Sequence, residues 1–333
     1  MKAWQVIHQG PIENNPLERA ERDIPEPGPN QVLLKVEACG LCHTDIHIAE
    51  GDIIPPRLPI VPGHQVVGRV VTIGSTISST KFTSGQRVGV PWLQTVCGSC
   101  PECLSGKTNL CQQATFTGFH TNGGFAEYMV ADEQSLLPLS ETICPELLAP
   151  LLCAGMVGFR AIKRAQVYAG CKVGLFGFGA SAHLVLQVLN KMGCEVLVFT
   201  RSAEHQNHAI ELGATWAGRP TDIARSQVES AIIFTPNGAS VEHALRVLRP
   251  GGTLAINAIH TSDIPSLPYK ALYQERTLTT VTNSTHQDGL EFIKFAIENQ
   301  IKSTVQAIGF EDLNRALVDL KHSRINGEAV LVF

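Results

Sequence analysis

Four cysteines are bunched in one short stretch of the chain, in the run C-G-S-C-P-E-C-L-S-G-K-T-N-L-C. They are Cys97, Cys100, Cys103 and Cys111, separated by two, two and seven residues. These gaps let a loop turn back on itself, so that four thiolates reach the corners of one tetrahedron. Such a site has no open coordination position, and we predict a structural zinc ion there. An iron–sulfur cluster and four unrelated buried cysteines are the alternatives.

A second set of metal-ligating residue types is scattered along the chain. Cys42 begins C-H-T-D-I-H, His64 stands in P-G-H-Q after a proline turn, and Cys153 stands in P-L-L-C-A-G. Each of them, taken singly, is compatible with an ordinary buried residue. Their contexts nevertheless separate them from the other cysteines.

A glycine motif follows an apolar run in the second half of the chain. The run at residues 172–176 predicts a strand, and G-F-G-A-S-A comes directly after it, with Gly177, Gly179 and Ala182 in the three motif positions. A helix predicted at 181–192 would then present backbone amide groups to a pyrophosphate. The motif in this context predicts a dinucleotide site, and a glycine turn without a ligand is the alternative.

The next predicted strand lacks the acidic residue that NAD-selective sites place at its end. It ends in Val-Phe-Thr-Arg-Ser, so that Thr200 stands where the acid would be. Arg201 and Ser202 could hold a 2′-phosphate through charge-assisted hydrogen bonds. We therefore favour NADP(H) over NAD(H), with Arg201 as a plain surface charge as the alternative.

Two different patterns of elements would position these residues. Residues 1–140 hold short β-branched runs between Pro/Gly clusters, which indicates an irregular β domain. From about residue 155 strands alternate with helices, which indicates a parallel, doubly wound sheet. The β runs lie at 32–36, 65–73 and 87–90, and the later strands at 172–176, 195–200, 230–234, 253–257 and 277–282. Helices are expected at 181–192, 203–212, 241–248, 290–299 and 311–321, before a last strand at 329–333.

Composition limits the classes of function. A chain of 333 residues exceeds what one core usually serves, and 44% hydrophobic with 17% charged residues is typical of a globular protein. The net charge of −4 argues against a nucleic acid partner. We recognise no secretory signal, and Pro150 and several glycines interrupt the apolar stretches, so we expect no membrane span. Ten cysteines in short clusters favour metal sites in a reducing cytoplasm.

These motifs together resemble the medium-chain zinc-dependent alcohol dehydrogenase family. The family motif C-G-L-C-H-T-D is matched by Cys39–Asp45, and the cysteine lobe, the glycine motif and the order of the domains also match. The resemblance implies an α/β fold in which an irregular GroES-like β domain is combined with a Rossmann domain. It implies a catalytic domain at 1–154, a dinucleotide-binding domain at 155–283 and a return to the catalytic domain at 284–333.

The resemblance also assigns roles to individual residues. Cys42, His64 and Cys153 would bind a catalytic zinc ion, and the fourth position would take water or substrate alcohol. Thr44 and His47 match a relay that carries a proton to solvent. Asp45 would hold the tautomer of His64, and His43 matches a pyrophosphate contact. The expected cofactors are thus two zinc ions per chain and NADP(H).

The chain departs from the family pattern at two positions. Gln65 stands after the ligand histidine, where the family usually carries Glu, and Glu328 stands where a family arginine contacts phosphate. Trp92 matches an aromatic position against the substrate and would restrict the pocket to small primary alcohols or aldehydes, although a core tryptophan is equally compatible with the sequence. His120 could border the same pocket.

We therefore expect a cytoplasmic homo-oligomer, dimeric or tetrameric, that interconverts small alcohols and aldehydes. A polyol dehydrogenase of the same superfamily is the nearest alternative, but such enzymes commonly use an acidic third zinc ligand where this chain has Cys153. A non-catalytic NADPH-binding scaffold is the other alternative. The Thr44–His47 pair argues against it, because a binding protein needs no exit for a proton.

Overall fold

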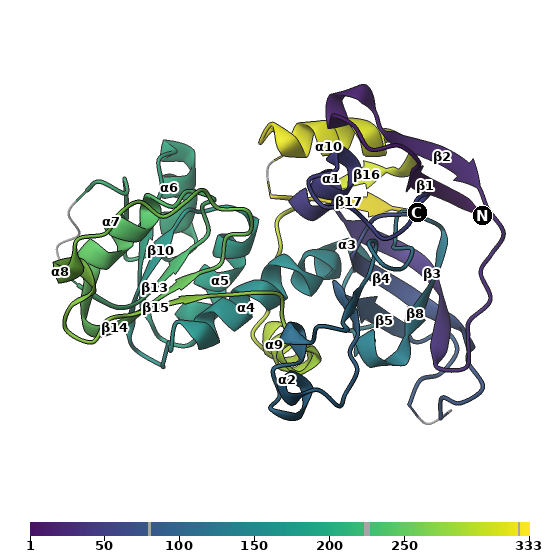
Figure 1. Ribbon diagram of the computed structural model, residues 1–333, viewed down its shortest axis with the longest axis horizontal. Coiled ribbons are helices and arrows are strands. Elements are labelled where there is room, and N and C mark those ends of the chain that lie inside the picture. Colours follow the sequence, from purple (N-terminus) through teal and green to yellow (C-terminus); the bar gives the residue numbers. More distant parts are fainter. Residues whose placement is uncertain (79–80, 223–226, 326) are drawn as a thin grey trace. The chain divides into compact units, whose positions relative to one another are not determined.

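The computed structural model describes residues 1–78, 81–222, 227–325 and 327–333 (Figure 1). The chain divides into two compact units, each with its own sheet and hydrophobic core. The first unit contains Met1–Cys153, Ser284–Lys294 and Lys302–Phe333, and the second contains Ala154–Asn283 and Phe295–Ile301.

A seven-stranded sheet organises the first unit. Six strands follow the order β16 (Val305–Gly309), β17 (Glu328–Val332), β3 (Gln31–Gly40), β4 (Gln65–Ile73), β5 (Arg87–Val90) and β9 (Leu137–Pro138), and β8 (Tyr128–Asp132) also pairs with β3. The pairs are antiparallel except β16 with β17, which run parallel. Strand β17, from the end of the chain, therefore lies beside β3, from its beginning.

Smaller elements surround this sheet. Two further pairs of strands are β1 (Lys2–Val6) with β2 (Leu17–Glu21) and β6 (Leu93–Thr95) with β7 (Thr115–Phe116). The helices are α1 (His43–Glu50), α2 (Pro101–Leu104), α3 (Pro145–Leu148) and α10 (Leu313–Lys321), with 3-10 turns at Ile12–Asn14, Thr108–Leu110, Glu133–Ser135, Ala149–Leu152 and Phe310–Asp312. Helix α9 (His286–Glu298) begins in the first unit and ends in the second.

The second unit contains a six-stranded parallel sheet. Its order is β12 (Trp216–Gly218), β11 (Glu195–Phe199), β10 (Lys172–Phe176), β13 (Val228–Ile233), β14 (Leu248–Ile256) and β15 (Thr277–Thr280). Strands β10 and β13 form the central pair. Strands β11 and β12 follow outward from β10, and β14 and β15 follow outward from β13, which is the strand order of a doubly wound dinucleotide-binding sheet. The structure thus confirms the predicted α/β class.

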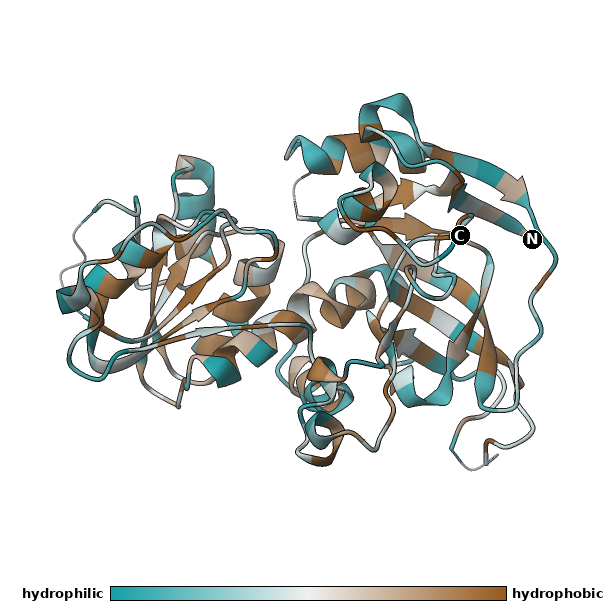
Figure 2. Cartoon of the chain, viewed as in Figure 1, coloured by the Kyte–Doolittle hydropathy of each residue, from teal (hydrophilic) through white to brown (hydrophobic). Residues whose placement is uncertain are grey.

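Helices enclose this parallel sheet. They are α4 (Ala154–Arg164), α5 (Ala180–Lys191), α6 (Ala203–Glu211), α7 (Ser240–Val247) and α8 (Tyr269–Leu272). Figure 1 shows the strands between α4 and α5 on one side and α7 and α8 on the other. The strands are hydrophobic along their length, whereas α6 is mostly polar (Figure 2), because a strand covered on both faces needs apolar side chains throughout.

Within the described residues, one apolar segment has the length and composition to span a membrane. It covers Pro145–Arg164, and 56% of its most apolar 18-residue stretch is buried inside the structure. The segment is divided into α3, a 3-10 turn and α4, and the backbone at Cys153 has a non-helical φ of −132°. The break coincides with the boundary between the two units, so that the segment supplies core to both of them.

His183 is a buried titratable group inside α5. It is 5% exposed, and its Nε2 has no hydrogen-bond partner among the described residues. Burial, together with the nearby His208, lowers the pKa of His183 to about 4. The folded protein therefore keeps this imidazole neutral at pH values where an unfolded chain would protonate it.

We expect the free energy of unfolding to fall as the pH decreases from about 6.5 to 4. Between these values the unfolded state binds a proton at His183 that the folded state does not, which costs about 3 kcal/mol by pH 4. Urea unfolding of the wild type and of His183→Leu across this range measures the effect, since the variant lacks the group. His8→Gln, which removes an exposed imidazole, is the control. Parallel pH profiles for the wild type and His183→Leu would contradict the prediction.

Candidate functional site

Cys42, His64 and Cys153 come together in the first unit, as their sequence contexts predicted. Their ligand atoms all lie within 4.8 Å of one another. Neighbouring donors around one tetrahedral zinc ion stand about 3.8 Å apart, given zinc–sulfur bonds of about 2.3 Å. The donor set therefore fits zinc. No fourth His, Cys or carboxylate joins this group in the described part of the chain, so a tetrahedral ion bound by these three residues would keep one position for a small molecule.

Local structure explains how these three ligands meet. Cys42 is the extended residue before α1, and His64 comes one residue before β4. Cys153 ends the first unit, after the 3-10 turn Ala149–Leu152. Strand β3 pairs with β4, with Gly40 opposite Gln65, and this pairing brings the residues that follow β3 close to those that precede β4. The site thus depends on pairing between distant strands.

Asp45 ties two of the ligands together. It is fully buried, and its Oδ2 accepts the backbone N–H of Cys42 at 2.8 Å. Its Oδ1 accepts the backbone N–H of Gly63 at 3.0 Å and lies 3.2 Å from Nδ1 of His64. A proton on Nδ1 leaves Nε2 as the donor atom for a metal ion, which is the role that the resemblance implied for Asp45.

The pKa shifts of His64, Cys42 and Cys153 are compatible with a site that releases protons when it binds a metal ion. Burial opposes a charge on His64, but Asp45 and Cys42 outweigh it and raise the pKa of His64 to about 10. A hydrogen bond from Cys153 lowers the pKa of Cys42, and the same bond raises the pKa of Cys153. A bound divalent cation would take the place of these protons, because metal ligands must be deprotonated.

The two residues of the expected proton relay lie on α1. The hydroxyl of Thr44 lies 3.7 Å from Sγ of Cys42. His47 is on the same helix, with its side chain 26% exposed, and its Nδ1 lies 2.7 Å from Oδ2 of Asp52. Asp52 was not identified from the sequence. The only signal for it was a carboxylate shortly after the end of a helix, a common arrangement at turns.

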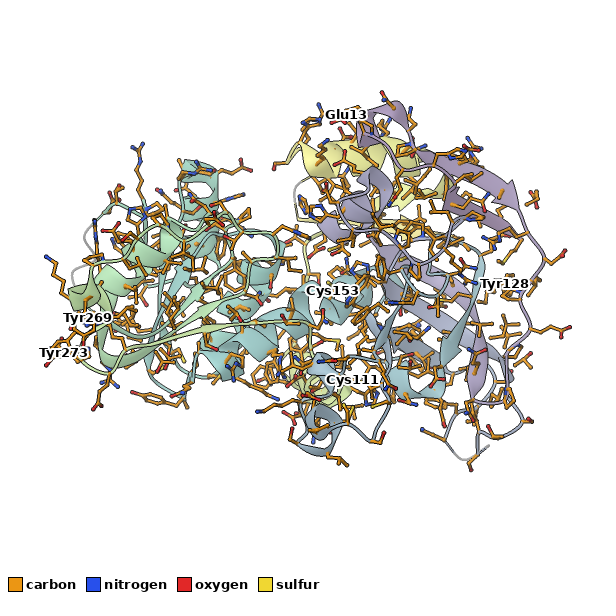
Figure 3. All side chains as sticks on the ribbon, in the orientation of Figure 1. Glu13, Cys111, Tyr128, Cys153, Tyr269 and Tyr273 are labelled. Carbon is orange, nitrogen blue, oxygen red and sulfur yellow. The ribbon has the colours of Figure 1, made fainter. Side chains whose placement is uncertain are left out.

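The four-cysteine cluster also has metal-binding geometry. The ligand atoms of Cys97, Cys100, Cys103 and Cys111 lie within 4.8 Å of one another. Sγ of Cys97 accepts the N–H of Cys100, and Sγ of Cys111 accepts the N–H of Cys97. Backbone N–H groups lower the pKa of Cys97 to about 6, which favours the thiolate form that metals bind. Cys153 and Cys111, one residue from each cluster, are labelled in Figure 3.

Aromatic side chains pack together beside His64. The ring of Trp92 meets that of His64 edge-on, with the centroids 5.0 Å apart, and stacks on Phe116 at 5.0 Å. Phe119 contacts Trp92, and His120 contacts Phe119 and accepts the backbone N–H of Phe116. The structure thus brings Trp92 and His120 into one cluster. The two phenylalanines that fix Trp92 were missed, because nothing in their spacing distinguishes them from core residues.

The glycine motif lies between β10 and α5 in the second unit. Gly177 has a φ of +94°, and a Cβ atom there would lie 2.6 Å from Cγ2 of Thr235, so that only glycine fits. Gly179 precedes the first turn of α5, and Ala182 is fully buried. The first N–H groups of this twelve-residue helix have no partner within the helix itself, and are suited to bind phosphate oxygens.

The residues expected at the adenosine ribose follow β11. Thr200 is buried, and its backbone N–H bonds to the carbonyl of Gly218. The hydroxyl of Ser202 accepts the N–H of His205 and caps α6, while Arg201 between them is exposed. His43 is the exposed first residue of α1 in the other unit, and its contact with pyrophosphate stays a prediction.

Comparisons with known proteins identify related sequences. The alcohol dehydrogenase GroES-like domain family matches residues 28–141, and the zinc-binding dehydrogenase family matches residues 182–298. A probable alcohol dehydrogenase AdhA of Mycobacterium tuberculosis is 41% identical over 100% of this chain and 97% of its own length. An alcohol dehydrogenase of Geobacillus stearothermophilus is 33% identical over 95% of each chain.

Solved structures show the same fold. An NAD-dependent alcohol dehydrogenase superposes with a TM-score of 0.91 at 24% identity, covering 100% of both chains. A structure described as CAD from Helicobacter pylori complexed with NADP(H) superposes with a TM-score of 0.86 at 23% identity, covering 99% of this chain and 97% of its own.

Replacing Asp45 with Asn tests its role as the support of the site. The amide cannot accept from all three N–H groups, so we expect Asp45→Asn to lower the free energy of unfolding by about 2–4 kcal/mol and to weaken metal retention. Asp288→Asn is a matched control, because Asp288 is also buried and accepts two hydrogen bonds from Thr285 away from the ligands. Denaturant unfolding measures the free energy of unfolding of both variants, and metal analysis measures how much metal each one retains. Wild-type metal retention in Asp45→Asn would show that Asp45 is dispensable for the site.

Proposed function

The chain belongs to the medium-chain zinc-dependent alcohol dehydrogenase family, and from this premise we propose that it interconverts small primary alcohols and aldehydes with zinc and NADP(H). The relatives support alcohol dehydrogenase activity as the general function. The observation that carries the proposal is the cluster of Cys42, His64 and Cys153, which offers three donors and leaves one tetrahedral position open.

The chain's own residues perform the proton transfer and the positioning. When bound, the zinc ion supplies Lewis acidity at the open corner of the cluster. The Thr44 hydroxyl beside Cys42 accepts the proton of the substrate alcohol, and His47 passes it to solvent while Asp52 holds its Nδ1. A bound nicotinamide would supply the hydride acceptor, so that one alcohol would yield one aldehyde, one proton and one reduced nicotinamide.

The environment of Trp92 supports a preference for small substrates. Its indole is fixed against the ligand His64 on one side and stacked on Phe116 on the other. A large ring held from two sides gives little room beside the metal position and cannot easily turn away. We therefore infer that short primary alcohols and aldehydes fit better than branched or secondary ones.

The four-cysteine cluster supports a second zinc ion with a structural role. Its four thiol groups complete a tetrahedron without an open corner, and only Cys111 among them is buried. The lobe around it consists of α2 and the 3-10 turn Thr108–Leu110, which are too short to form a core of their own. A metal ion at this place would fix the lobe, as in other closed zinc sites.

We further infer a homo-oligomer in the cytoplasm. Strand β15 ends the parallel sheet, and next to it in the sequence stand Tyr269 and Tyr273, which are 76% and 60% exposed (Figure 3). A sheet edge beside exposed aromatic rings is suited to pair with another copy. Clustered metal-binding thiols favour a reducing compartment.

Metal analysis and turnover test the proposal together. We expect two zinc ions per wild-type chain and formation of NADPH from NADP with ethanol, propanol or benzyl alcohol. Cys42→Ser should lose one zinc ion and about a thousandfold or more in kcat/KM, because about 4 kcal/mol of Lewis-acid stabilisation is removed. Cys100→Ser should instead lower the melting temperature. Zinc-loaded wild type that turns over no alcohol or aldehyde would favour an NADPH-binding scaffold.

Arg201→Ala tests the preference for NADP. Loss of a charge-assisted contact with the 2′-phosphate should reduce kcat/KM with NADP about 10- to 100-fold, since such a contact contributes about 1.5–3 kcal/mol. Turnover with NAD should change little. Arg246→Ala on α7 is the control, because it also removes an exposed guanidinium from the second unit. Equal effects of Arg201→Ala on both cofactors would refute the preference.

A further inference from the structure

Glu328 is a buried carboxylate that the mechanism above does not use. It is the first residue of β17 and is 5% exposed. Its Oε1 is buried without a hydrogen-bond partner among the described residues. A buried carboxylate in this condition is expensive unless a positive charge compensates it. The residues around Glu328 therefore indicate which positive charge could compensate it.

The strand register places Glu328 opposite Cys42. In the antiparallel pair of β17 with β3, Val330 lies opposite Gly40 and Leu331 opposite Cys39. The N–H of Leu41 bonds to the carbonyl of Ala329 at 2.9 Å, so the pairing continues past the end of β3. Cys42 is still extended, with φ −134° and ψ 156°, and the continued register sets it against Glu328. Directly opposed residues have side chains on the same face, with Cβ atoms about 5 Å apart.

Gln65 approaches the same face from the other side of β3. It lies opposite Gly40, and a Cβ atom on Gly40 would come within 2.9 Å of its side-chain carbon Cδ. The absence of a side chain at Gly40 thus lets Gln65 lie across β3. Its Nε2 donates to the carbonyl of Leu41. The two positions at which the chain departs from the family pattern, Gln65 and Glu328, therefore flank one metal ligand.

The electrostatic interactions agree with a position of Glu328 close to Cys42 and Cys153. Burial raises the pKa of Glu328, and the nearby Cys42 raises it further. The charge of Glu328 in turn contributes to raising the pKa of Cys153. The carboxylate is outside the group of three mutually close donor atoms, so that it acts at longer range than a direct ligand.

We propose that Glu328 is a positioning residue for the catalytic metal ion, whose carboxylate faces the ion from behind Cys42 and holds it in the site by charge. The inference rests on the zinc site of the proposed function and adds a residue to it. Asp45 commits its oxygens to three N–H groups, whereas Glu328 has an uncommitted oxygen. Because Gln65 is uncharged, Glu328 is the carboxylate on this face of the sheet that can interact with the ion. The negative charge that the family usually carries at position 65 is thus carried here by Glu328 on strand β17, in addition to the charge of Asp45.

Metal release from the intact holoenzyme tests the proposal. Glu328→Gln keeps the shape and removes the charge, and we expect zinc at Cys42, His64 and Cys153 to transfer to a chelator about 10- to 100-fold faster. Cys42→Ser is expected to lack this zinc ion, so the zinc release that it does not show is assigned to this site. The cobalt-substituted enzyme should show a shifted absorption spectrum. Glu311→Gln, an exposed carboxylate in the same C-terminal segment, is the control and should behave like the wild type.

Two further measurements distinguish charge from structure. The metal-free Glu328→Gln protein should melt at the same or a higher temperature than the metal-free wild type, because a buried carboxyl group with an unpaired oxygen and no compensating cation is gone. The double variant Gln65→Glu/Glu328→Gln should recover slow zinc release, since it returns the charge to the same face.

Three results would overturn the proposal. They are zinc release from Glu328→Gln at the wild-type rate with an unchanged cobalt spectrum, a lower melting temperature of its metal-free form, and a double variant that stays as fast as the single one. A wild-type protein that binds no metal at Cys42, His64 and Cys153 would instead refute the proposed function itself.

Discussion

The hydrogen bonds of the buried Asp45 carboxylate are the interactions on which the rest of the site depends. They join the start of α1, the turn before β4 and the ring of His64 through distances of 2.8, 3.0 and 3.2 Å. The three N–H groups stabilise this fully buried carboxylate, so that each of the three partners is held in place by the same charge. The geometry of Cys42 and His64 follows from this one group. The rest of the first unit supplies the strand pairing that brings the partners within reach.

The elements that carry the glycine motif were predictable because their signals are local. The strand predicted at 172–176 is β10, and the helix predicted at 181–192 is α5, which starts one residue earlier and also ends one residue earlier. The predicted strand at 65–73 coincides with β4. Periodicity and glycine position decide such elements without tertiary contacts. The four-cysteine cluster was predicted from residue type and spacing, whereas Cys42, His64 and Cys153 were assigned through the family resemblance, and the structure brings each set together.

Residues whose roles depend on distant pairing could not be found in this way. Glu328 is far from Cys42 in the sequence and meets it only through the register of β17 on β3. Phe116 and Phe119 look like ordinary core residues until their rings are seen around Trp92. Asp52 contacts His47 from a turn whose path the sequence leaves open. In each case the missing information is a contact in space, because residue type alone does not distinguish these positions from many others.

The ionisable groups buried in the first unit indicate why a bound metal ion would matter to the fold as well as to the proposed reaction. Cys42, Cys153, Asp45 and Glu328 form an acidic group around one histidine. Among the described residues the one buried Lys or Arg is Arg87, and its guanidinium is already bound to Glu37 at 2.7 Å and to backbone carbonyls. A divalent cation is thus the charge that can balance the group, since buried charges persist only when they are compensated. Metal binding and stability of this unit should therefore be linked.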